Sequence, residues 1–305
     1  MTTAITIAGL EKAYGAKQAV AGLDLDVREG EVFSLLGPNG AGKTTTVEIL
    51  EGFRTRDAGH VSVLGEDPHS AGRNWRNRIG IVLQSSTGLD LLTPREVLAS
   101  TARTYSRPRP TEEVLEAVGL TDKADVRVAG LSGGQRRRLD VGLGIVGRPQ
   151  LLFLDEPTTG FDPQARRDFW ELIRSLATEG TTILLTTHYL DEAEQLADRV
   201  GIIAGGRMLA LDTPTNLGGR NASEATVVWE AAGERHTLQT SEPTAEVSRL
   251  ATRFGGEVPG LLVTRPSLED TYLALVGPHL ADDADDAPAP AGRRARRPRA
   301  KELAR

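Results

Sequence analysis

The 305-residue chain contains no cysteine, which excludes disulfide bonds, thiolate metal sites and cysteine nucleophiles. Any bound metal must therefore be a hard ion held by oxygen ligands. Aromatic residues make up only 4% of the chain, and the formal net charge is −6. Residues 281–305 hold seven basic and five acidic side chains, so the rest of the chain carries −8. Because nucleic-acid grooves are built from basic and stacking residues, we expect no nucleic-acid partner.

Long hydrophobic runs are missing as well. No segment approaches the roughly 18 uncharged apolar residues of a membrane span. The first residues, "MTTAITIAGLEKAYG", have neither the basic nor the apolar region of a secretory signal. Hydrophobic residues at 39% and charged residues at 26% are typical of a soluble globular protein. We expect a cytoplasmic protein that meets a membrane only through a partner or a surface contact.

The order of the apolar segments indicates an α/β fold. Strand-like stretches in residues 4–36 lead into a glycine-rich loop, and after residue 150 buried strand-like stretches alternate with helical ones. This alternation predicts a mixed, mainly parallel sheet with helices packed on it, interrupted by an inserted helical subdomain at about 85–148. In that subdomain Thr93 and Glu96 predict a capping box, and Thr111 is expected to cap a second helix that Gly119 closes.

Composition divides the chain into three parts. Residues 1–216 form the main domain. Residues 217–278 predict a small α+β appendage, with strands around 225–230, 236–240 and 260–265 and a helix at 268–277. Residues 279–305 are dominated by proline, alanine and charged residues, which predicts a disordered tail.

The stretch "GPNGAGKTT" at 37–45 fills the G-x-x-x-x-G-K-[ST] pattern between a strand and a helix. Glycines let successive N–H groups turn toward phosphate oxygens, and the positive end of the helix adds to the attraction. The pattern places Lys43 at the β- and γ-phosphates, the Thr44 hydroxyl on Mg²⁺ and Thr45 at a further phosphate oxygen. The alternative is a glycine turn that only opens a helix. The expected nucleotide-binding residues are Gly37, Pro38, Asn39, Gly40, Ala41, Gly42, Lys43, Thr44 and Thr45.

Two adjacent carboxylates end the buried strand in "LLFLDEP" at 151–157. Ligands of parallel sheets bind at the carboxyl ends of strands, so Asp155 can hold Mg²⁺ through water. Glu156 would face the γ-phosphate as the base that orients the attacking water. The same two acids could instead mark the start of the next helix.

Together these residues resemble the nucleotide-binding subunits of ABC transporters. The match covers roughly residues 4–215 and rests on motifs in the expected order. They are "GPNGAGKTT", Gln84 after a strand, "LSGGQ" at 131–135, "LLFLDEP", "TTGFDP" and His188 after a strand. With "LEDTYLALVG" near the C-terminus, the chain looks most like the daunorubicin-resistance type of bacterial exporter ATPase. The resemblance implies that residues 1–216 bind and hydrolyse ATP, that two copies close around ATP, and that a separate transmembrane permease moves the substrate.

The resemblance also implies roles for single residues. Tyr14 resembles the aromatic on which adenine stacks. Gln84 resembles the glutamine that touches both Mg²⁺ and the attacking water, and His188 resembles the histidine that contacts the γ-phosphate. Asp162 resembles the aspartate that communicates between sites, and Phe161 beside it stands where the family commonly has leucine.

The stretch "LSGGQ" has two readings. Ser132 and Gln135 fit the S-x-x-Q capping box, so the stretch could serve only to start a helix. The resemblance places Ser132, Gly133, Gly134 and Gln135 against the ATP of a second copy. A hydroxyl has one donor and two acceptor lone pairs, so the serine can accept the Gln135 N–H and still donate to a γ-phosphate.

Two other functions fit parts of the pattern. One is a soluble ABC-type ATPase that acts on ribosomes or DNA. Ribosome-acting relatives usually carry two ATPase units, and DNA-repair relatives insert long coiled coils between the two loops, whereas Lys43 and Ser132 are 89 residues apart. The other is a non-hydrolysing regulatory subunit, against which the presence of Glu156 and His188 weighs. We therefore expect an ATPase on the inner face of the cell membrane that powers export of a drug-like or lipophilic compound.

Overall fold

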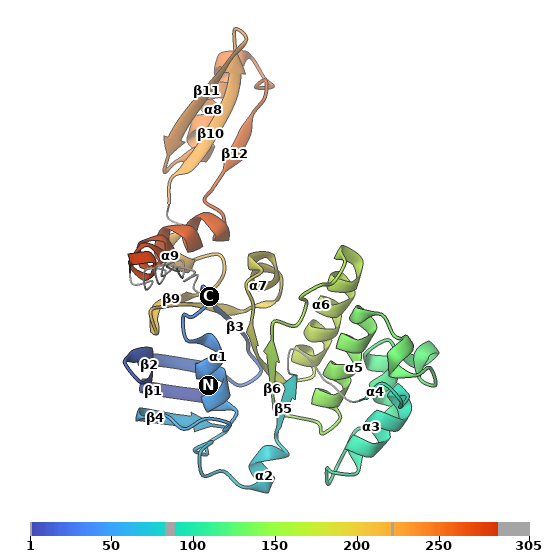
Figure 1. The fold of residues 1–305 in the computed structure, drawn as a ribbon. Helices are drawn as coiled ribbons and strands as arrows, with labels where there is room; N and C mark the ends of the chain where they lie inside the picture. The colour runs from blue at the N-terminus through green and yellow to red at the C-terminus, as the bar shows by residue number, and fades with distance from the viewer. Residues whose placement is uncertain (1, 83–88, 221–222, 286–305) are drawn as a thin grey trace, which may run out of the picture.

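A six-stranded sheet forms the centre of the computed structural model, which describes residues 2–82, 89–220 and 223–285 (Figure 1). The strand order is β5-β6-β7-β3-β8-β9, and all neighbours are parallel except β8 and β9. This confirms the predicted mixed, mainly parallel sheet. The strands are β3 (Val32–Leu36), β5 (Ile79–Val82), β6 (Leu151–Asp155), β7 (Thr182–Thr186), β8 (Arg199–Ala204) and β9 (Arg207–Asp212).

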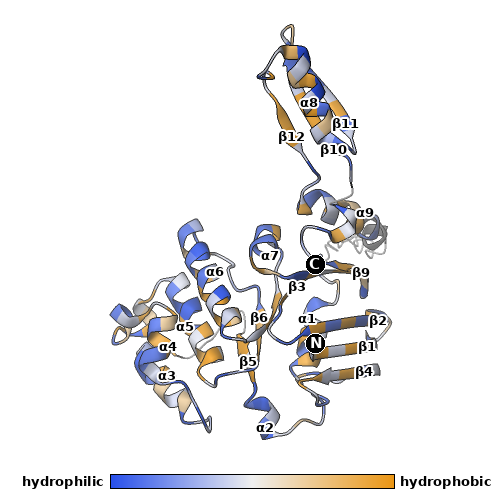
Figure 2. Ribbon diagram, turned by 180° about the vertical axis from the view of Figure 1, so that it is seen from behind, coloured by the Kyte–Doolittle hydropathy of each residue, from blue (hydrophilic) through white to orange (hydrophobic). Residues whose placement is uncertain are grey.

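The inner strands are buried along almost their whole length. Strand β6 has the sequence "LLFLD" and β7 has "TILLT", and neither alternates between apolar and polar residues. Such continuous runs are typical of parallel strands that are covered on both faces. Figure 2 shows the same pattern, with apolar residues along the central strands and hydrophilic residues on the outer faces of the helices.

A second, antiparallel sheet covers one side of the central sheet. It has the order β2-β1-β4 and encloses helix α1 (Lys43–Leu50) between itself and β3. Ile5, Leu23 and Val61 from this sheet share one buried core with Phe33 and Leu50. This core fixes the helix that follows the glycine-rich loop. The strands are β1 (Thr3–Tyr14), β2 (Lys17–Arg28) and β4 (Ala58–Val63).

The inserted helices cover the other side. They follow β5 and precede β6 in the chain, and their apolar residues join those of α6 in one core. Helix α5 approaches β5 closely at two glycines, because a Cβ on Gly80 would lie 2.2 Å from the carbonyl oxygen of Gly144. The helices on this side are α3 (Pro94–Ala102), α4 (Thr111–Ala117), α5 (Gly133–Ile145) and α6 (Pro163–Thr178). The short helices elsewhere are α2 (Arg73–Arg76) and α7 (Leu190–Leu196).

The expected helix ends are confirmed in two cases and wrong in one. Thr93 and Glu96 form the predicted capping box of α3. Gly119 has φ +63° after the end of α4, and its N–H donates to the Glu116 carbonyl. Thr111 does not cap α4, because it is already the first helical residue and Pro110 is the N-cap. A capping side chain needs a non-helical backbone, which Pro110 has in place of Thr111.

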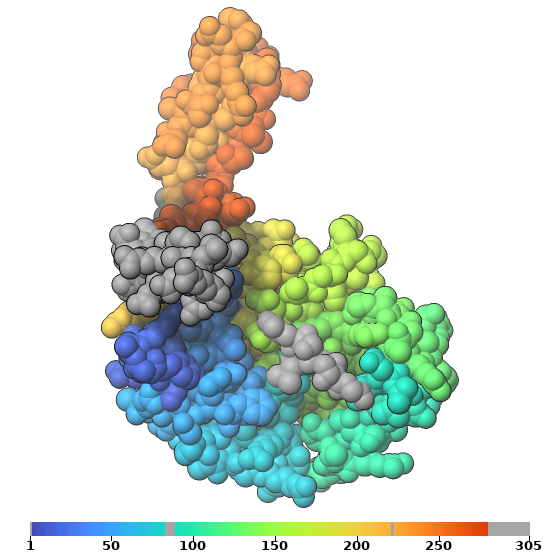
Figure 3. Space-filling view, in the orientation of Figure 1, coloured from blue at the N-terminus to red at the C-terminus, as the bar shows by residue number. Residues whose placement is uncertain are grey.

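The C-terminal region forms two different structures. An antiparallel sheet of order β11-β10-β12, with α8 on one face, stands away from the rest of the molecule (Figures 1 and 3). Val227, Leu250 and Val258 form its own small core. We call this unit, residues 225–264, the appendage. Its elements are β10 (Ala225–Ala231), β11 (Glu234–Thr240), α8 (Pro243–Phe254) and β12 (Leu262–Thr264).

Helix α9 (Leu268–Asp285) packs on the main body instead of on the appendage. Leu268 and Val276 lie in one core with Leu36 and Ile202 of the central sheet. We predicted residues 217–278 as one unit. In the structure the appendage has its own core, whereas α9 packs on the main body. Helix α9 also runs past 278, where we expected the charged tail to begin. The rest of the predicted tail, 286–305, lies outside the described residues.

Two arginines hold the connections to the appendage together. Arg220 Nε donates to the Pro266 carbonyl at 2.6 Å, and Arg220 Nη1 pairs with Glu194 Oε1 of α7 at 2.6 Å. Arg265 Nη1 donates to the Ser223 carbonyl at 3.2 Å. The segments that lead into and out of the appendage are therefore close together.

Among the helices of the described residues, we find none whose length and apolar character suit a membrane span.

We predict that the appendage can be removed without unfolding the main body. Replacing residues 225–264 by a short Gly/Ser linker should leave the melting temperature of the main transition within a few degrees. Truncation after residue 265 keeps the appendage but removes α9, and each lost core side chain such as Leu268 or Val276 costs about 1.5–3 kcal/mol. Thermal unfolding and gel filtration of both variants test this prediction. Equal destabilisation by the two deletions would contradict it.

Candidate nucleotide-binding site

The candidate site lies at the carboxyl ends of three neighbouring strands. Strands β6, β7 and β3 are adjacent in the sheet, and each is followed by one of the predicted segments. The glycine-rich loop follows β3, Glu156 follows β6 and His188 follows β7. A pocket of about 390 Å³ opens at this edge. It is lined by Tyr14, Lys17, Ala19, Asn39, Gly40, Gly42, Lys43, Thr44, Thr45, Asp155 and Glu156.

Two glycines of the loop are required by close backbone contacts. Gly42 is the N-cap of α1 with φ +102°, and a Cβ there would lie 2.3 Å from the Ala19 carbonyl oxygen. A Cβ on Gly37 would lie 2.3 Å from the Ile203 carbonyl oxygen. The loop is therefore held tightly against β2 and β8, with the N-terminal end of α1 at the pocket.

Lys43 is buried, with 9% of its surface exposed. Its Nζ donates to the Gly37 carbonyl at 2.6 Å and to the Pro38 carbonyl at 3.0 Å. Burial lowers the pKa of the Lys43 ammonium, while the nearby carboxylates of Glu156 and Asp155 raise it. The loop thus holds a cation beside the two acids that end β6.

Hydrogen bonds with Thr186, the last residue of β7, orient both Asp155 and Glu156. The Thr186 hydroxyl donates to Asp155 Oδ1, which leaves the other carboxylate oxygen of Asp155 for a ligand. Glu156 has φ +43°, a left-handed conformation that is uncommon for a non-glycine residue. Its N–H donates to the Thr186 carbonyl at 3.0 Å.

His188 lies beside Glu156. His188 Nδ1 is 3.3 Å from Glu156 Oε1, and the His188 side chain is 46% exposed whereas that of Glu156 is 22% exposed. The imidazole also contacts the ring of Tyr189, with the centroids 4.1 Å apart. The fold therefore brings together two residues that are 32 positions apart in the sequence.

Tyr14 lies at the rim of the pocket and is 42% exposed. Lys12 Nζ and Arg54 Cζ lie 5.7 and 5.4 Å from the centre of its ring. Lys17 also lines the pocket, and sequence reasoning missed it. Its position three residues after Tyr14, across the tight turn between β1 and β2, was the signal that could have found it.

The residues of the "LSGGQ" stretch do not line this pocket. The predicted capping box is confirmed, because Ser132 Oγ accepts the Gln135 N–H at 3.2 Å and Gln135 Oε1 accepts the Ser132 N–H at 3.0 Å. A separate pocket of about 590 Å³ is lined by Ser132, Gly133, Gly134, Gln135 and Asp162, among others. We call it the signature pocket.

Asp162 caps helix α6. Its Oδ1 accepts the N–H groups of Gln164 and Ala165, both at 2.9 Å. Phe161 points inward and packs edge-on against Phe169, with the ring centroids 5.8 Å apart. Phe161 and Asp162 both line the signature pocket. Gln84, predicted to contact Mg²⁺ and water, lies outside the described residues.

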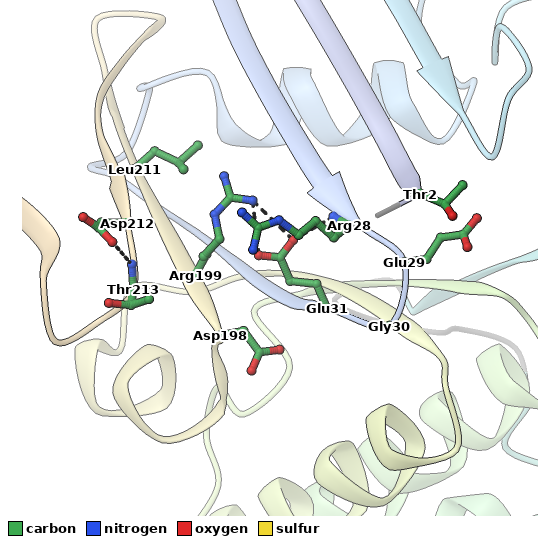
Figure 4. Close-up of a pocket in the computed structure, with 10 residues that line it drawn as sticks. All are labelled: Thr2, Arg28, Glu29, Gly30, Glu31, Asp198, Arg199, Leu211, Asp212 and Thr213. Atoms are coloured by element: carbon green, nitrogen blue, oxygen red, sulfur yellow. Dashed lines mark hydrogen bonds and ion pairs between the residues drawn. The ribbon is translucent and has the colours of Figure 1, made fainter.

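A larger pocket, of about 890 Å³, lies at the opposite edge of the sheet (Figure 4). Glu31 and Arg199 line it at the amino ends of β3 and β8. Arg199 Nη1 pairs with Glu31 Oε1 at 3.3 Å and with Asp26 Oδ2 at 3.1 Å. Because ligands of such sheets bind at the carboxyl ends of strands, we do not assign the nucleotide to this pocket.

Fold and site together define a nucleotide-binding protein of the phosphate-loop class. The sequence profile of the family described as "ABC transporter" matches residues 20–159. Daunorubicin resistance ATP-binding protein DrrA2 of Streptomyces coeruleorubidus is 41% identical over 90% of this chain and 95% of its own length. Nod factor export ATP-binding protein I of Rhizobium meliloti is 40% identical over 92% of this chain and 90% of its own.

Solved structures agree on the fold. One described as the ATP-binding subunit of an ABC transporter matches with a TM-score of 0.66 and 23% identity, over 89% of this chain and 99% of the other. A second, a dimeric ATP-binding cassette bound to ADP and Pi, matches with a TM-score of 0.62 over 68% of this chain and 98% of the other. The chain belongs to the family of ABC transporter ATP-binding proteins, and it is an ATP-hydrolysing nucleotide-binding subunit.

Glu51, at the end of α1, gives the stability a pH dependence that can be tested. Burial, together with the nearby charges of Asp155 and Glu48, raises the pKa of its carboxyl to about 8. In the unfolded chain the carboxyl ionises near its ordinary value of 4.5. Between these two values the folded chain keeps a proton that the unfolded chain releases. This contribution to stability is complete below pH 4.5 and is lost as the pH rises through about 8.

We therefore predict that Glu51→Gln stabilises the protein more at pH 8 than at pH 5. The difference in the free energy of unfolding should be about 3 kcal/mol larger at pH 8. Urea unfolding at both pH values measures it, with Glu29→Gln at an exposed position as the control. A gain for Glu51→Gln that is the same at both pH values would contradict the prediction.

Proposed function

We propose that two copies of this chain bind ATP and Mg²⁺ between them, with the phosphate loop of one copy facing the signature pocket of the other. ATP closes the pair and hydrolysis reopens it, which drives a separate transmembrane permease. The residues up to 216 serve as the ATPase domain, held at the inner face of the membrane by the permease. One observation carries the proposal. Within one chain, the pocket of about 390 Å³ at the glycine-rich loop, which we call the phosphate-loop pocket, is separate from the signature pocket.

The donor set at the phosphate loop suits Mg²⁺. A hydroxyl from Thr44 and a carboxylate oxygen from Asp155 are the hard oxygen ligands that this ion prefers, with substrate phosphates and water completing its shell. No cluster of three or more potential metal-binding side chains occurs in the part of the chain that the structure describes. When bound, Mg²⁺ would neutralise charge on the β- and γ-phosphates.

Each residue of the candidate site would have a separate role in binding the nucleotide or in its hydrolysis. Lys43 would compensate phosphate charge, as a buried ammonium does more strongly than one in water. Glu156 would orient the attacking water. His188 Nδ1, close to the Glu156 carboxylate, would hold that side chain and leave Nε2 for a phosphate oxygen. Tyr14 would stack on adenine at the rim of the pocket.

Export of a drug-like or lipophilic compound is supported by the names of the relatives, which describe daunorubicin resistance and Nod factor export. Co-expression with a candidate transmembrane permease tests the assignment. A stable membrane complex with an altered ATPase rate would support it. Stable association with ribosomes or DNA in its place would favour the soluble ABC-type ATPase.

We predict that Glu156→Gln removes turnover but keeps ATP binding. A positioned base contributes roughly 10²- to 10⁴-fold, so kcat should fall at least 100-fold. The Kd for ATP should stay within about threefold, and an ATP-bound dimer should accumulate. Steady-state kinetics, ATP binding and gel filtration with ATP measure these effects. Normal turnover in the variant would remove Glu156 from the role of base.

We predict that Ser132→Ala still binds ATP but loses dimer closure and hydrolysis. A hydrogen bond to a charged group contributes about 1.5–3 kcal/mol, which corresponds to a loss of roughly 10- to 100-fold. Thr93→Ala is the matched control, because it removes the same type of capping box at α3, worth about 1 kcal/mol. Hydrolysis that is equally normal in both variants would leave Ser132 with only its capping role.

A further inference from the structure

Arg137 is a buried arginine in the second turn of helix α5. Only 7% of its surface is exposed. Its Nε donates to the Pro157 carbonyl at 3.0 Å, and its Nη2 donates to the Asp155 carbonyl at 2.7 Å. The two accepting carbonyls lie on either side of Glu156 in the chain. One guanidinium therefore holds the backbone both before and after the proposed base.

The backbone of Glu156 needs such support. Its φ of +43° is in the left-handed region, where a non-glycine residue carries strain of about 1–3 kcal/mol. Strained residues persist only where the surrounding structure determines their conformation. The Thr186 carbonyl holds the Glu156 N–H from β7, and Arg137 holds the neighbouring carbonyls from α5. The turn is thus anchored from two sides.

Stability alone does not explain a guanidinium at this place. Removing an arginine from water costs several kcal/mol, and apolar side chains of similar volume often stabilise a fold as well or better. Burial lowers the pKa of the Arg137 guanidinium, and the nearby carboxylates of Asp140, Asp155 and Glu192 only partly oppose this lowering. What an apolar residue or a lysine lacks is the planar fork that can donate to two carbonyls at once.

Helix α5 links this anchor to the signature pocket. Ser132 is the N-cap of the helix, and Arg137 follows it within the same 13-residue α5. On the other side of the turn, Thr158 and Glu192 are completely buried. Burial raises the pKa of the Glu192 carboxyl, and the neighbouring Thr187 and Thr158 hydroxyls only partly oppose this rise. The turn that carries Glu156 therefore lies between α5 and α7 in a packed, polar environment.

We propose that Arg137 is a positioning residue that fixes Glu156 relative to helix α5. The proposal rests on the proposed function, in which Glu156 is the base and α5 carries the signature loop. The side chain of Arg137 does not line the pocket at the glycine-rich loop. It acts by donating to the Asp155 and Pro157 carbonyls. These bonds keep Glu156 at a fixed position relative to helix α5. The N-terminal end of α5 carries Ser132, which in the proposed function faces the ATP of the second copy.

Steady-state kinetics of Arg137→Gln and Arg136→Gln test the proposal. Arg136 is the adjacent arginine of α5, with its side chain 44% exposed and paired with Asp90 at 3.6 Å. Arg137→Gln should lower kcat at least 30-fold and change the KM for ATP less than threefold, whereas Arg136→Gln should behave as wild type. Arg137→Lys keeps the charge but not the fork, and it should show an intermediate kcat. A parallel change in KM, or wild-type kcat in Arg137→Gln, would overturn the proposal.

Two further measurements separate this proposal from the proposed function. In the nucleotide-free protein, hydrogen exchange in residues 155–160 should be at least tenfold faster in Arg137→Gln than in Arg136→Gln, and equal rates would overturn the positioning role. In the Glu156→Gln background, Arg137→Gln should still allow the ATP-bound dimer to accumulate. Loss of that dimer would make Arg137 a determinant of closure and overturn the proposal. Normal turnover of Glu156→Gln alone would instead remove Glu156 from the role of base that the proposed function gives it.

Discussion

The arrangement of the site depends on the buried ammonium of Lys43 beside the carboxylates that end β6. The parallel order of β6, β7 and β3 brings this cation, Asp155 and Glu156 to one edge of the sheet. The tight loop around Gly37 and Gly42 keeps the ammonium there by hydrogen bonds to its own carbonyl groups. Because opposite charges in a poorly hydrated place interact more strongly than in water, small displacements of either partner matter.

The second constraint is the turn after β6. Thr186, Arg137 and the residues around Glu192 approach it from three elements that are distant in the chain. Two of these elements also carry a group with a proposed role: His188 follows β7, and Ser132 begins α5. A movement of the helical subdomain or of His188 would therefore displace this turn and with it Glu156.

The appendage is a separate structural unit. Its core consists of a few apolar residues between β10 and α8, and Arg220 and Arg265 hold together the segments that connect it to the main body. Arg220 also pairs with Glu194 of α7, so the base of the appendage is attached to the helix that follows His188. Helix α9, although it follows the appendage in the chain, belongs by its packing to the main body.

Much of the fold and site could be predicted from the sequence. The spacing in "GPNGAGKTT", the apolar runs of β6 and β7 and the capping boxes at Thr93 and Ser132 are local patterns, and local chemistry determines such features. Helix α8 also has a local pattern, with Val247, Leu250, Ala251 and Phe254 at helical spacing, but we did not predict it.

Other features were decided only by the tertiary structure. Three of them are contacts between distant segments: the hydrogen bonds of Arg137 to the carbonyls beside Glu156, the contact of His188 with Glu156, and the packing of α9 on the main body. The fourth is the left-handed backbone of Glu156, which these surroundings hold in place. Residue spacing along one chain does not specify which distant groups meet, because those contacts depend on how the helices and the sheet pack. The sequence by itself thus determined the chemistry of the site, and the packing decided how its residues are held.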